Sequence, residues 1–345
     1  MLLQKFEMIA AKTLMALPTE MLRAFGDDIK RERVLDPKIR AALLLAKIKP
    51  KIETLSPVHA RRVFEYIINL FDLPKADIAR VEDFTIAGIF GRIPVRLYSP
   101  SGRAELLPCV IYYHGGGFVI GSLESHDRVL RYLSRLTGCA ILAVDYRLAP
   151  EHVFPASWED AYSAYKWVRS GGKAVGLDPK KVAVGGDSAG GNLAISISTR
   201  AKKDRIAAPT FQILFYPWID LAQERKSVEE FGSGYVLTRD LLRYFKKHAF
   251  ANTSDCLNSL ATPLKLSSFS GTPPTYIQVA GFDPLQDENL AYVDVLRKAN
   301  VSVEAKVYGE LIHGFINLAG KIPAAREPLM DAAVWIRKGF KLKRE

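Results

Sequence analysis

From about residue 81 onwards, two patterns of apolar residues alternate along the chain. Short apolar runs rich in β-branched and aromatic residues predict buried strands, whereas apolar residues spaced three or four apart predict helices. The predicted strands are 109–114, 140–146, 182–185, 211–216, 275–280 and 303–308. The predicted helices are 127–136, 158–169, one that begins just after residue 188, 288–299 and 331–340. Continuous apolar strands separated by helices indicate an α/β protein, in which a mostly parallel sheet carries helices on both faces.

Other segments depart from this alternation. Residues 81–87 and 93–98 alternate apolar and polar positions, which is typical of a hairpin with one exposed face. Residues 1–80 show helical spacing throughout and are divided by prolines into short pieces, so we expect a helical N-terminal segment. Residues 219–255 are polar and helical and are too long for a simple connection between strands. We therefore expect a cap insertion at 219–255 and an α/β core formed by residues 81–218 and 256–345.

The charge of the chain is unusual for a protein of ordinary composition. Its 345 residues carry a formal net charge of +11, and the sequence pI of about 9.4 raises the question of a nucleic-acid or membrane-surface partner. The excess is peripheral, because residues 1–80 carry a net +5 and residues 321–345 a net +4, whereas the residues between them carry only +2. Dispersed charges of this kind are typical of solvated helix faces and a tail, so we expect no nucleic-acid partner.

Cysteine content and hydropathy bear on the compartment. The cysteines Cys109, Cys139 and Cys256 are too few for a disulfide framework, and no His and Cys cluster suggests a metal site. No apolar run approaches 18 residues without a charge, so we expect no transmembrane helix, no stable membrane association and a cytoplasmic location. We expect the apolar face of the first helix to pack in the cap rather than on a membrane surface; its members are Leu2, Leu3, Phe6 and Ile9.

The content of thermolabile residues is low. Asn, Gln, Cys and Met together number only 20 of 345 residues. Such a composition favours a thermostable protein.

Gly186-Asp187-Ser188-Ala189-Gly190 lies between a predicted strand and a predicted helix. Glycines at both ends of such a segment permit a very tight turn that exposes the serine Oγ above the start of the helix. The alternative is a serine that only caps the helix. The strand–turn–helix setting favours the interpretation of Ser188 as a nucleophile.

His114-Gly115-Gly116-Gly117-Phe118 ends another predicted strand. Backbone amides of glycines can approach an oxyanion closely, because no Cβ stands in the way. The alternative is a phosphate-binding loop, but no Gly-Lys-Ser/Thr follows and no Gly-x-Gly-x-x-Gly occurs in the chain. We therefore interpret the segment as a source of oxyanion-binding amides.

A nucleophilic serine needs a base, and the base needs a carboxylate that orients it. His313 and Asp283 each follow a predicted strand, so both are expected at the carboxyl edge of the sheet together with Ser188. Their order along the chain, with the serine first and the histidine last, is that of α/β-hydrolases. Asp145 is an alternative carboxylate, but its strand precedes that of the serine, so we interpret its Asp-Tyr-Arg segment as a structural brace.

Five segments together resemble the hormone-sensitive-lipase family of α/β-hydrolase esterases: HGGGF (114–118), DYRLAPE (145–151), GDSAGGN (186–192), GFDPLQDE (281–288) and HGF (313–315). The resemblance covers about residues 81–340, and the N-terminal segment is similar to that family's cap. It implies an eight-stranded sheet whose second strand is antiparallel, and hydrolysis of acyl esters without a cofactor. Gln286 stands where many relatives carry an arginine.

The resemblance also implies roles for individual residues. Ser188 is expected to be the nucleophile, His313 the general base and acid, and Asp283 the orienting carboxylate. The oxyanion hole is expected to consist of the amides of Gly116, Gly117 and Ala189. The residues expected to support these motifs are His114, Gly115 and Asp187, and no metal is expected.

The function expected on this basis is that of a serine carboxylesterase, acting on short- to medium-chain acyl esters through an acyl-enzyme intermediate. Two alternatives stay open. Some relatives are non-catalytic small-molecule receptors that lack the histidine, whereas His313 is present here. An amidase or deacetylase could also use the same three residues. The sequence leaves open the natural ester and the formation of a homodimer.

Overall fold

A single sheet of eight strands forms the centre of the computed structural model, which describes residues 13–23, 26–47, 50–102 and 106–342. Its strands are β3 (Arg80–Gly88), β4 (Gly91–Ser99), β5 (Leu107–Tyr113), β6 (Ala140–Val144), β7 (Leu177–Asp187), β8 (Gln212–Phe215), β9 (Thr275–Phe282) and β10 (Val303–Ile312). Their order is β10-β9-β8-β7-β5-β6-β4-β3. Strand β4 is antiparallel to both of its neighbours, and the other pairs are parallel. The predicted eight-stranded, mostly parallel sheet is confirmed.

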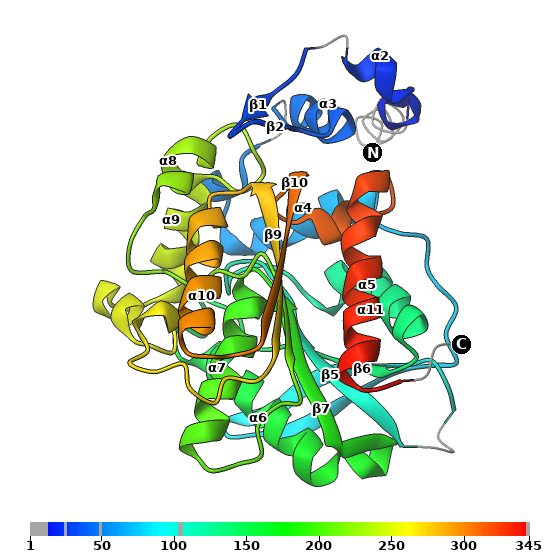
Figure 1. Ribbon diagram of the computed structural model, residues 1–345, viewed down its shortest axis with the longest axis vertical. Helices are drawn as coiled ribbons and strands as arrows, with labels where there is room; N and C mark the ends of the chain where they lie inside the picture. Colours follow the sequence, from blue (N-terminus) through cyan, green and yellow to red (C-terminus); the bar gives the residue numbers. More distant parts are fainter. Residues whose placement is uncertain (1–12, 24–25, 48–49, 103–105, 343–345) are drawn as a thin grey trace.

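Helices cover both faces of the sheet (Figure 1). On one side lie α5 (Leu123–Thr137) and α11 (Arg326–Gly339), and on the other α6 (Ala156–Gly171), α7 (Ala189–Lys203) and α10 (Gln286–Lys298). Each face has its own hydrophobic cluster. Leu133 and Ile336 belong to the first, and Leu193 and Leu296 to the second. This two-sided burial explains why the central strands are apolar at nearly every position.

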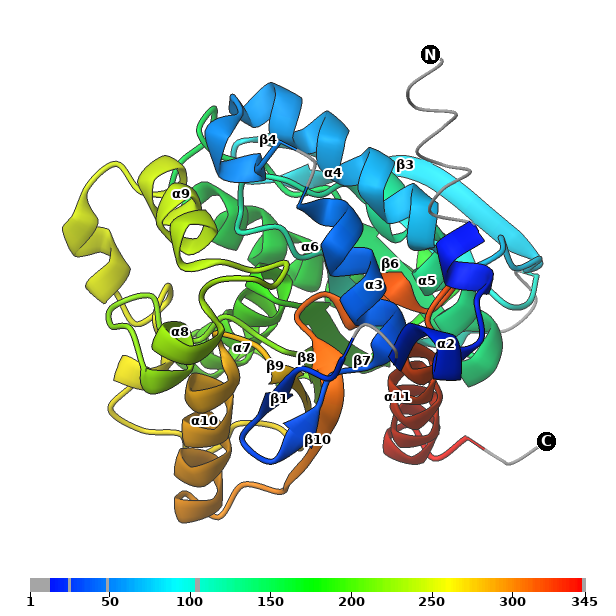
Figure 2. The ribbon, with the colours of Figure 1, turned by 90° about the horizontal axis from the view of Figure 1, so that it is seen from above.

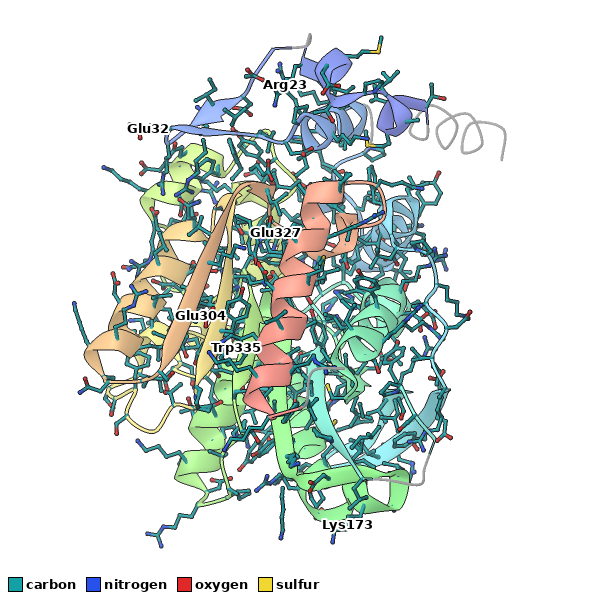
Figure 3. All side chains as sticks on the ribbon, turned by 45° about the vertical axis from the view of Figure 1, so that its right-hand side comes forward. Arg23, Glu32, Lys173, Glu304, Glu327 and Trp335 are labelled. Carbon is teal, nitrogen blue, oxygen red and sulfur yellow. The ribbon has the colours of Figure 1, made fainter. Side chains whose placement is uncertain are left out.

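Contacts across the layers also involve polar groups. Figure 3 labels Trp335 on α11 and Glu304 on β10, and the indole Nε1 of Trp335 donates a hydrogen bond to Glu304 Oε2 at 3.2 Å. The ring of Trp335 stacks on Tyr276 of β9. The last helix is thereby fixed against the last two strands of the sheet.

The N-terminal segment lies over one end of the sheet and contains α2 (Thr19–Arg23), α3 (Pro37–Ala46) and α4 (Pro57–Phe71) (Figures 1 and 2). The expectation that it is helical throughout is wrong between α2 and α3. There β1 (Ile29–Lys30) and β2 (Arg33–Val34) form a short antiparallel hairpin. Strands of two residues are too short to show an alternating pattern, so the helical spacing of the flanking residues dominated the prediction.

The segment 219–255 contains α8 (Lys226–Phe231) and α9 (Arg239–Ala249). Thr238 caps α9 by accepting a hydrogen bond from the amide of Leu241 at 3.0 Å. The hydroxyl of Tyr244, on α9, donates to the carbonyl of Leu55 at 3.1 Å, so the two segments predicted to form the cap contact each other. The division of the chain into cap and core units stays a prediction.

Within the described ranges, no helix is long and apolar enough to cross a bilayer. The prediction that the first helix packs in the cap rather than on a membrane surface concerns Leu2, Leu3, Phe6 and Ile9, which lie outside the described residues.

Candidate active site

Ser188 occupies a strained turn between β7 and α7. Its φ of 52° lies in a region that non-glycine residues seldom adopt. The turn is held from both sides, because the Ser188 amide donates to the Phe215 carbonyl at 2.9 Å and the Ser188 carbonyl accepts from the Trp218 amide at 3.0 Å. A Cβ on Gly190 would come within 1.8 Å of the Tyr113 carbonyl oxygen. The glycine therefore allows the first turn of α7 to lie directly against the end of β5, beside the serine turn.

Asp283 and His313 follow the ends of β9 and β10, and the fold brings both to Ser188. His313 Nε2 lies 2.9 Å from Ser188 Oγ, and its Nδ1 lies 2.8 Å from Asp283 Oδ2. The second carboxylate oxygen of Asp283 accepts the amide of Leu285 at 2.8 Å. Exposure is 8% for Ser188, 1% for Asp283 and 8% for His313. With the Nδ1 proton directed at the carboxylate, Nε2 can accept the serine proton.

Three backbone amides near Ser188 have no acceptor in the part of the chain that the structure describes. Gly116 and Gly117 have φ angles of 118° and 60°, which suit glycine alone or nearly so. Among the described residues, neither amide donates to a protein group, and the amide of Ala189, the first residue of α7, has no partner either. These are the three amides that the sequence predicted for an oxyanion hole, and they remain available as hydrogen-bond donors.

Asp187 connects the serine turn to the glycine segment. Its buried Oδ1 accepts the Tyr112 hydroxyl at 3.0 Å and the Gly115 amide at 2.9 Å, and lies 3.1 Å from His126 Nε2. Burial on its own would raise the pKa of Asp187, but His126, Tyr112 and His114 hold it below its ordinary value. The carboxylate therefore stays ionised and fixes the position of the glycine segment.

His114 also has a structural setting. Its ring stacks on Tyr146 with centroids 4.3 Å apart, and the Tyr146 hydroxyl donates to the His114 carbonyl at 2.6 Å. Burial is the main cause that lowers the pKa of His114 to about 4, so the ring is neutral at neutral pH. Its Nδ1 lies 2.8 Å from the Gly115 carbonyl oxygen. The ring supports the glycine segment and does not contact Ser188.

The alternative carboxylate, Asp145, follows β6, and its backbone amide donates to the Pro94 carbonyl at 3.0 Å. Its side-chain carboxylate makes no hydrogen bond among the described residues. Its neighbours act as the brace. Tyr146 contacts His114, and Arg147 donates to both carboxylate oxygens of Asp160 at 2.8 Å. Histidine contacts distinguish the two carboxylates, since only Asp283 is hydrogen-bonded to His313.

Sequence reasoning did not find several residues that surround these groups. The ring of Tyr216 lies 4.6 Å from that of His313, and the ring of Phe245, on α9, covers Gly117. A Cβ on Gly117 would be 2.1 Å from that phenyl ring. His126 on α5 contacts Asp187 across the fold. No local signal marks these side chains, because their roles arise from packing between distant segments.

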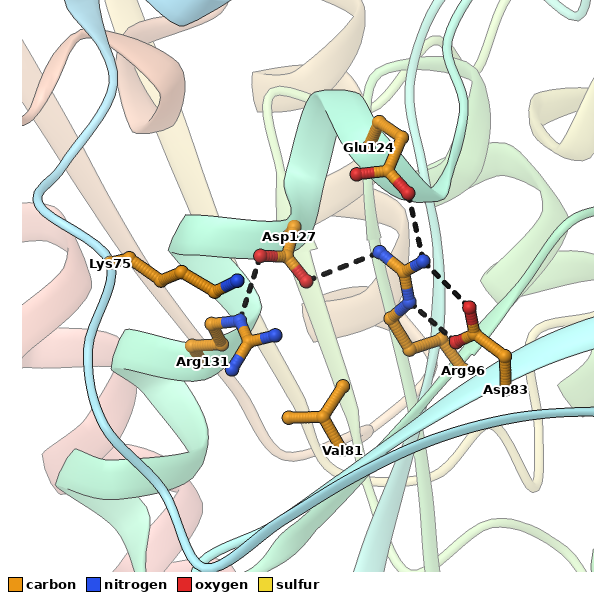
Figure 4. A pocket seen from close by; sticks show the side chains of 7 residues that line it. All are labelled: Lys75, Val81, Asp83, Arg96, Glu124, Asp127 and Arg131. Carbon is orange, nitrogen blue, oxygen red and sulfur yellow. Dashed lines mark hydrogen bonds and ion pairs between the residues drawn. The ribbon is translucent and has the colours of Figure 1, made fainter.

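A cavity of about 360 Å³ lies elsewhere, beside the edge strands and α5 (Figure 4). It is lined by Lys75, Val81, Asp83, Arg96, Glu124, Asp127 and Arg131. Arg96 pairs with Asp83 at 2.6 Å and with Glu124 at 2.8 Å. Three basic and three acidic side chains line this cavity, and the lining contains no serine, cysteine or histidine. Among the described residues, no group of three or more His, Cys, Asp or Glu side chains could hold a metal ion.

The fold and the Ser–His–Asp contact together define the class of protein, an α/β-hydrolase. A family model described as the α/β-hydrolase fold matches residues 110–317. Carboxylic ester hydrolase LipN of Mycobacterium tuberculosis is 41% identical over 244 residues, which are 69% of this chain and 65% of that protein. Ethyl acetate hydrolase of Pseudomonas putida is 34% identical over 306 residues, 86% of this chain and 96% of that protein.

The chain is also similar to a solved structure of an esterase. The hyperthermophilic esterase from Pyrobaculum calidifontis is 39% identical, with a TM-score of 0.83 over 88% of this chain and 98% of that chain. The chain belongs to the α/β-hydrolase family, and the resemblance to its hormone-sensitive-lipase group is confirmed.

Proposed function

We propose that the protein is a serine carboxylesterase with Ser188 as nucleophile, His313 as general base and acid, and Asp283 as the carboxylate that orients His313. The observation that carries the proposal is the position of His313, whose two ring nitrogens lie within hydrogen-bonding distance of Ser188 Oγ and Asp283 Oδ2. The esterase names of the relatives support the same chemistry.

The mechanism follows from these positions. His313 Nε2 takes the hydroxyl proton as Ser188 Oγ attacks the ester carbonyl, and Asp283 stabilises the imidazolium that forms. The amides of Gly116, Gly117 and Ala189 donate to the oxyanion of the tetrahedral intermediate. His313 then protonates the leaving alcohol, and a water molecule repeats the cycle on the acyl-enzyme.

The surroundings of the site favour short- to medium-chain esters. Phe245 packs directly on Gly117, which places a bulky ring beside one of the proposed oxyanion donors. The residues between the two basic end segments are close to neutral, which suits an uncharged ester. A cytoplasmic location, a homodimer and thermal stability remain predictions of the sequence.

The alternatives differ in what Ser188 does. A receptor on the same fold needs no activated serine, whereas here His313 is in contact with the hydroxyl. A fluorophosphonate probe labels only an activated serine, so labelling argues against a receptor. Parallel assays with a p-nitrophenyl ester and the matching p-nitroanilide would separate an esterase from an amidase.

The decisive test is Ser188→Ala with p-nitrophenyl butyrate as substrate. We expect turnover to fall by at least about 10⁴-fold, since the nucleophile is removed while the fold is kept. Ser196→Ala is the matched control, because the Ser196 hydroxyl donates to the Leu193 carbonyl within α7 and to no other group in the described part of the chain. Activity that survives in a folded Ser188→Ala protein would falsify the assignment.

A further inference from the structure

Arg31, at the tip of the β1–β2 hairpin, contacts the segment that follows Asp283. Its Nη1 donates to Gln286 Oε1 at 2.6 Å and to Asp287 Oδ1 at 2.7 Å. Its Nε donates to Glu230 Oε2 on α8 at 2.7 Å. One guanidinium therefore joins the hairpin, α8 and the first turn of α10.

The partners of Arg31 are themselves connected to the loop that carries Asp283. Gln286 Nε2 donates to the carbonyls of Ala280 and Gly281, at the end of β9, at 3.0 and 2.8 Å. Asp287 Oδ2 accepts the amide of Ser227, whose hydroxyl donates to the Pro284 carbonyl at 2.6 Å. The residues before Asp283 are thus held by Gln286, which Arg31 contacts, and Pro284 after it is held by Ser227, which is bonded in turn to Asp287.

The backbone of the hairpin is unfavourable for its sequence. Arg31 and Glu32 have φ angles of 49° and 60°, both in the left-handed region. Two-residue turns of this kind favour Asn-Gly or Asp-Gly, and non-glycine residues are held there only when the surroundings determine the conformation. The contacts of Arg31 with α8 and α10 provide such surroundings.

The residues that flank the hairpin contact β10, whose end precedes His313, and the segment between α8 and α9. The amide of Asp36 donates to the carbonyl of Glu310 at 3.0 Å, three residues before His313. The hydroxyl of Tyr235 donates to Asp28 Oδ2 at 2.8 Å. Figures 1 and 2 show the hairpin over the end of the sheet, beside β10 and the start of α10.

We propose that Arg31 is a positioning residue, which holds the segment 283–287 so that the Asp283 carboxylate stays in contact with His313. Arg31 brings the positive charge that pairs with Glu230 and Asp287, and Gln286 beside it is uncharged. The expected effect of Arg31 on turnover rests on the proposed function. Its expected effect on the conformation of the segment 283–287 does not. Displacements near 1 Å of catalytic groups can cost about 10²-fold in rate, so a modest shift of Asp283 is measurable.

The test compares Arg31→Met with Arg200→Met. Arg200 is a matched control, because its guanidinium also pairs with both oxygens of a carboxylate, Glu159, and lies over the ring of Tyr162. Arg200 lies near the C-terminal end of α7, whereas Ser188 lies at the N-terminal end of this helix. We expect Arg31→Met to lower kcat by about tenfold with KM changed by less than about twofold. Arg31→Lys should recover part of the loss, since an ammonium can pair with Asp287 but cannot form the whole set of contacts.

Hydrogen exchange measured by mass spectrometry gives an independent readout. Faster exchange in peptides covering 283–289 is expected in Arg31→Met and not in Arg200→Met. The inference is overturned if this exchange is unchanged, if kcat stays within twofold of the unmodified protein, if only KM rises, or if both variants lose activity equally. If the unmodified protein hydrolyses no ester, the proposed function fails, and the exchange measurement still decides the role of Arg31.

Discussion

Replacing Gly116 by alanine adds one methyl group at the proposed oxyanion hole. The φ of Gly116 is 118°, a conformation that residues with a Cβ rarely adopt. The new Cβ would lie 2.1 Å from the Ile120 carbonyl oxygen and 2.6 Å from its carbon. That carbonyl is part of the backbone and cannot turn aside as a flexible side chain could. The turn that begins at Gly116 must therefore open.

The size of the effect follows from this displacement. The Gly116 carbonyl accepts the amides of Val119 and Ile120, so the turn is closed by two hydrogen bonds and opens only as a unit. An opening of about 1 Å moves the amide of Gly116 away from the oxyanion. Loss of one such donor typically costs about 10²–10³ in kcat, or about 3–4 kcal/mol of transition-state stabilisation. KM should change little, because the donor acts mainly in the transition state.

The assay is steady-state hydrolysis of p-nitrophenyl butyrate, with the active fraction counted by fluorophosphonate titration and folding checked by thermal melting. Gly102→Ala is the control, since a Cβ there meets no atom within 4 Å. We expect Gly102→Ala to keep full activity. A folded Gly116→Ala protein with kcat within threefold of the unmodified protein would refute the assignment of this amide.

Two further predictions concern acyl length and pH. Phe245→Ala removes the ring that covers Gly117. The ratio of kcat/KM for p-nitrophenyl octanoate to kcat/KM for p-nitrophenyl butyrate should therefore rise about tenfold or more. An unchanged ratio would show that Phe245 does not limit the acyl chain. Burial raises the pKa of Asp72 to about 6, so its contribution to stability is present below about pH 4 and is lost as the pH rises through about 6. Asp72→Asn cannot titrate, and the difference in unfolding free energy between variant and unmodified protein should therefore rise by about 2 kcal/mol between pH 4 and pH 7. Urea denaturation at both pH values measures it, and a difference independent of pH would contradict the role given to Asp72.

The accuracy of the sequence predictions depended on how local each feature is. Strands β5, β6 and β9 were predicted because two-sided burial makes nearly every position apolar. The β1–β2 hairpin was missed because its strands have two residues each, and its conformation depends on contacts with α8 and α10. Local spacing carries no information about such contacts.

The sequence by itself determined the α/β alternation, the two glycine-rich segments and the choice of Ser188, Asp283 and His313 as candidates. Each of these is marked by its immediate neighbours, because burial periodicity and tight turns are local requirements. Only the tertiary structure decided that His313 lies 2.9 Å from Ser188 Oγ, and that Arg31 meets Glu230 and Gln286, which are 199 and 255 residues further along the chain. Contacts over such separations depend on how the sheet and the segments above it pack together, and no short stretch of sequence specifies that packing.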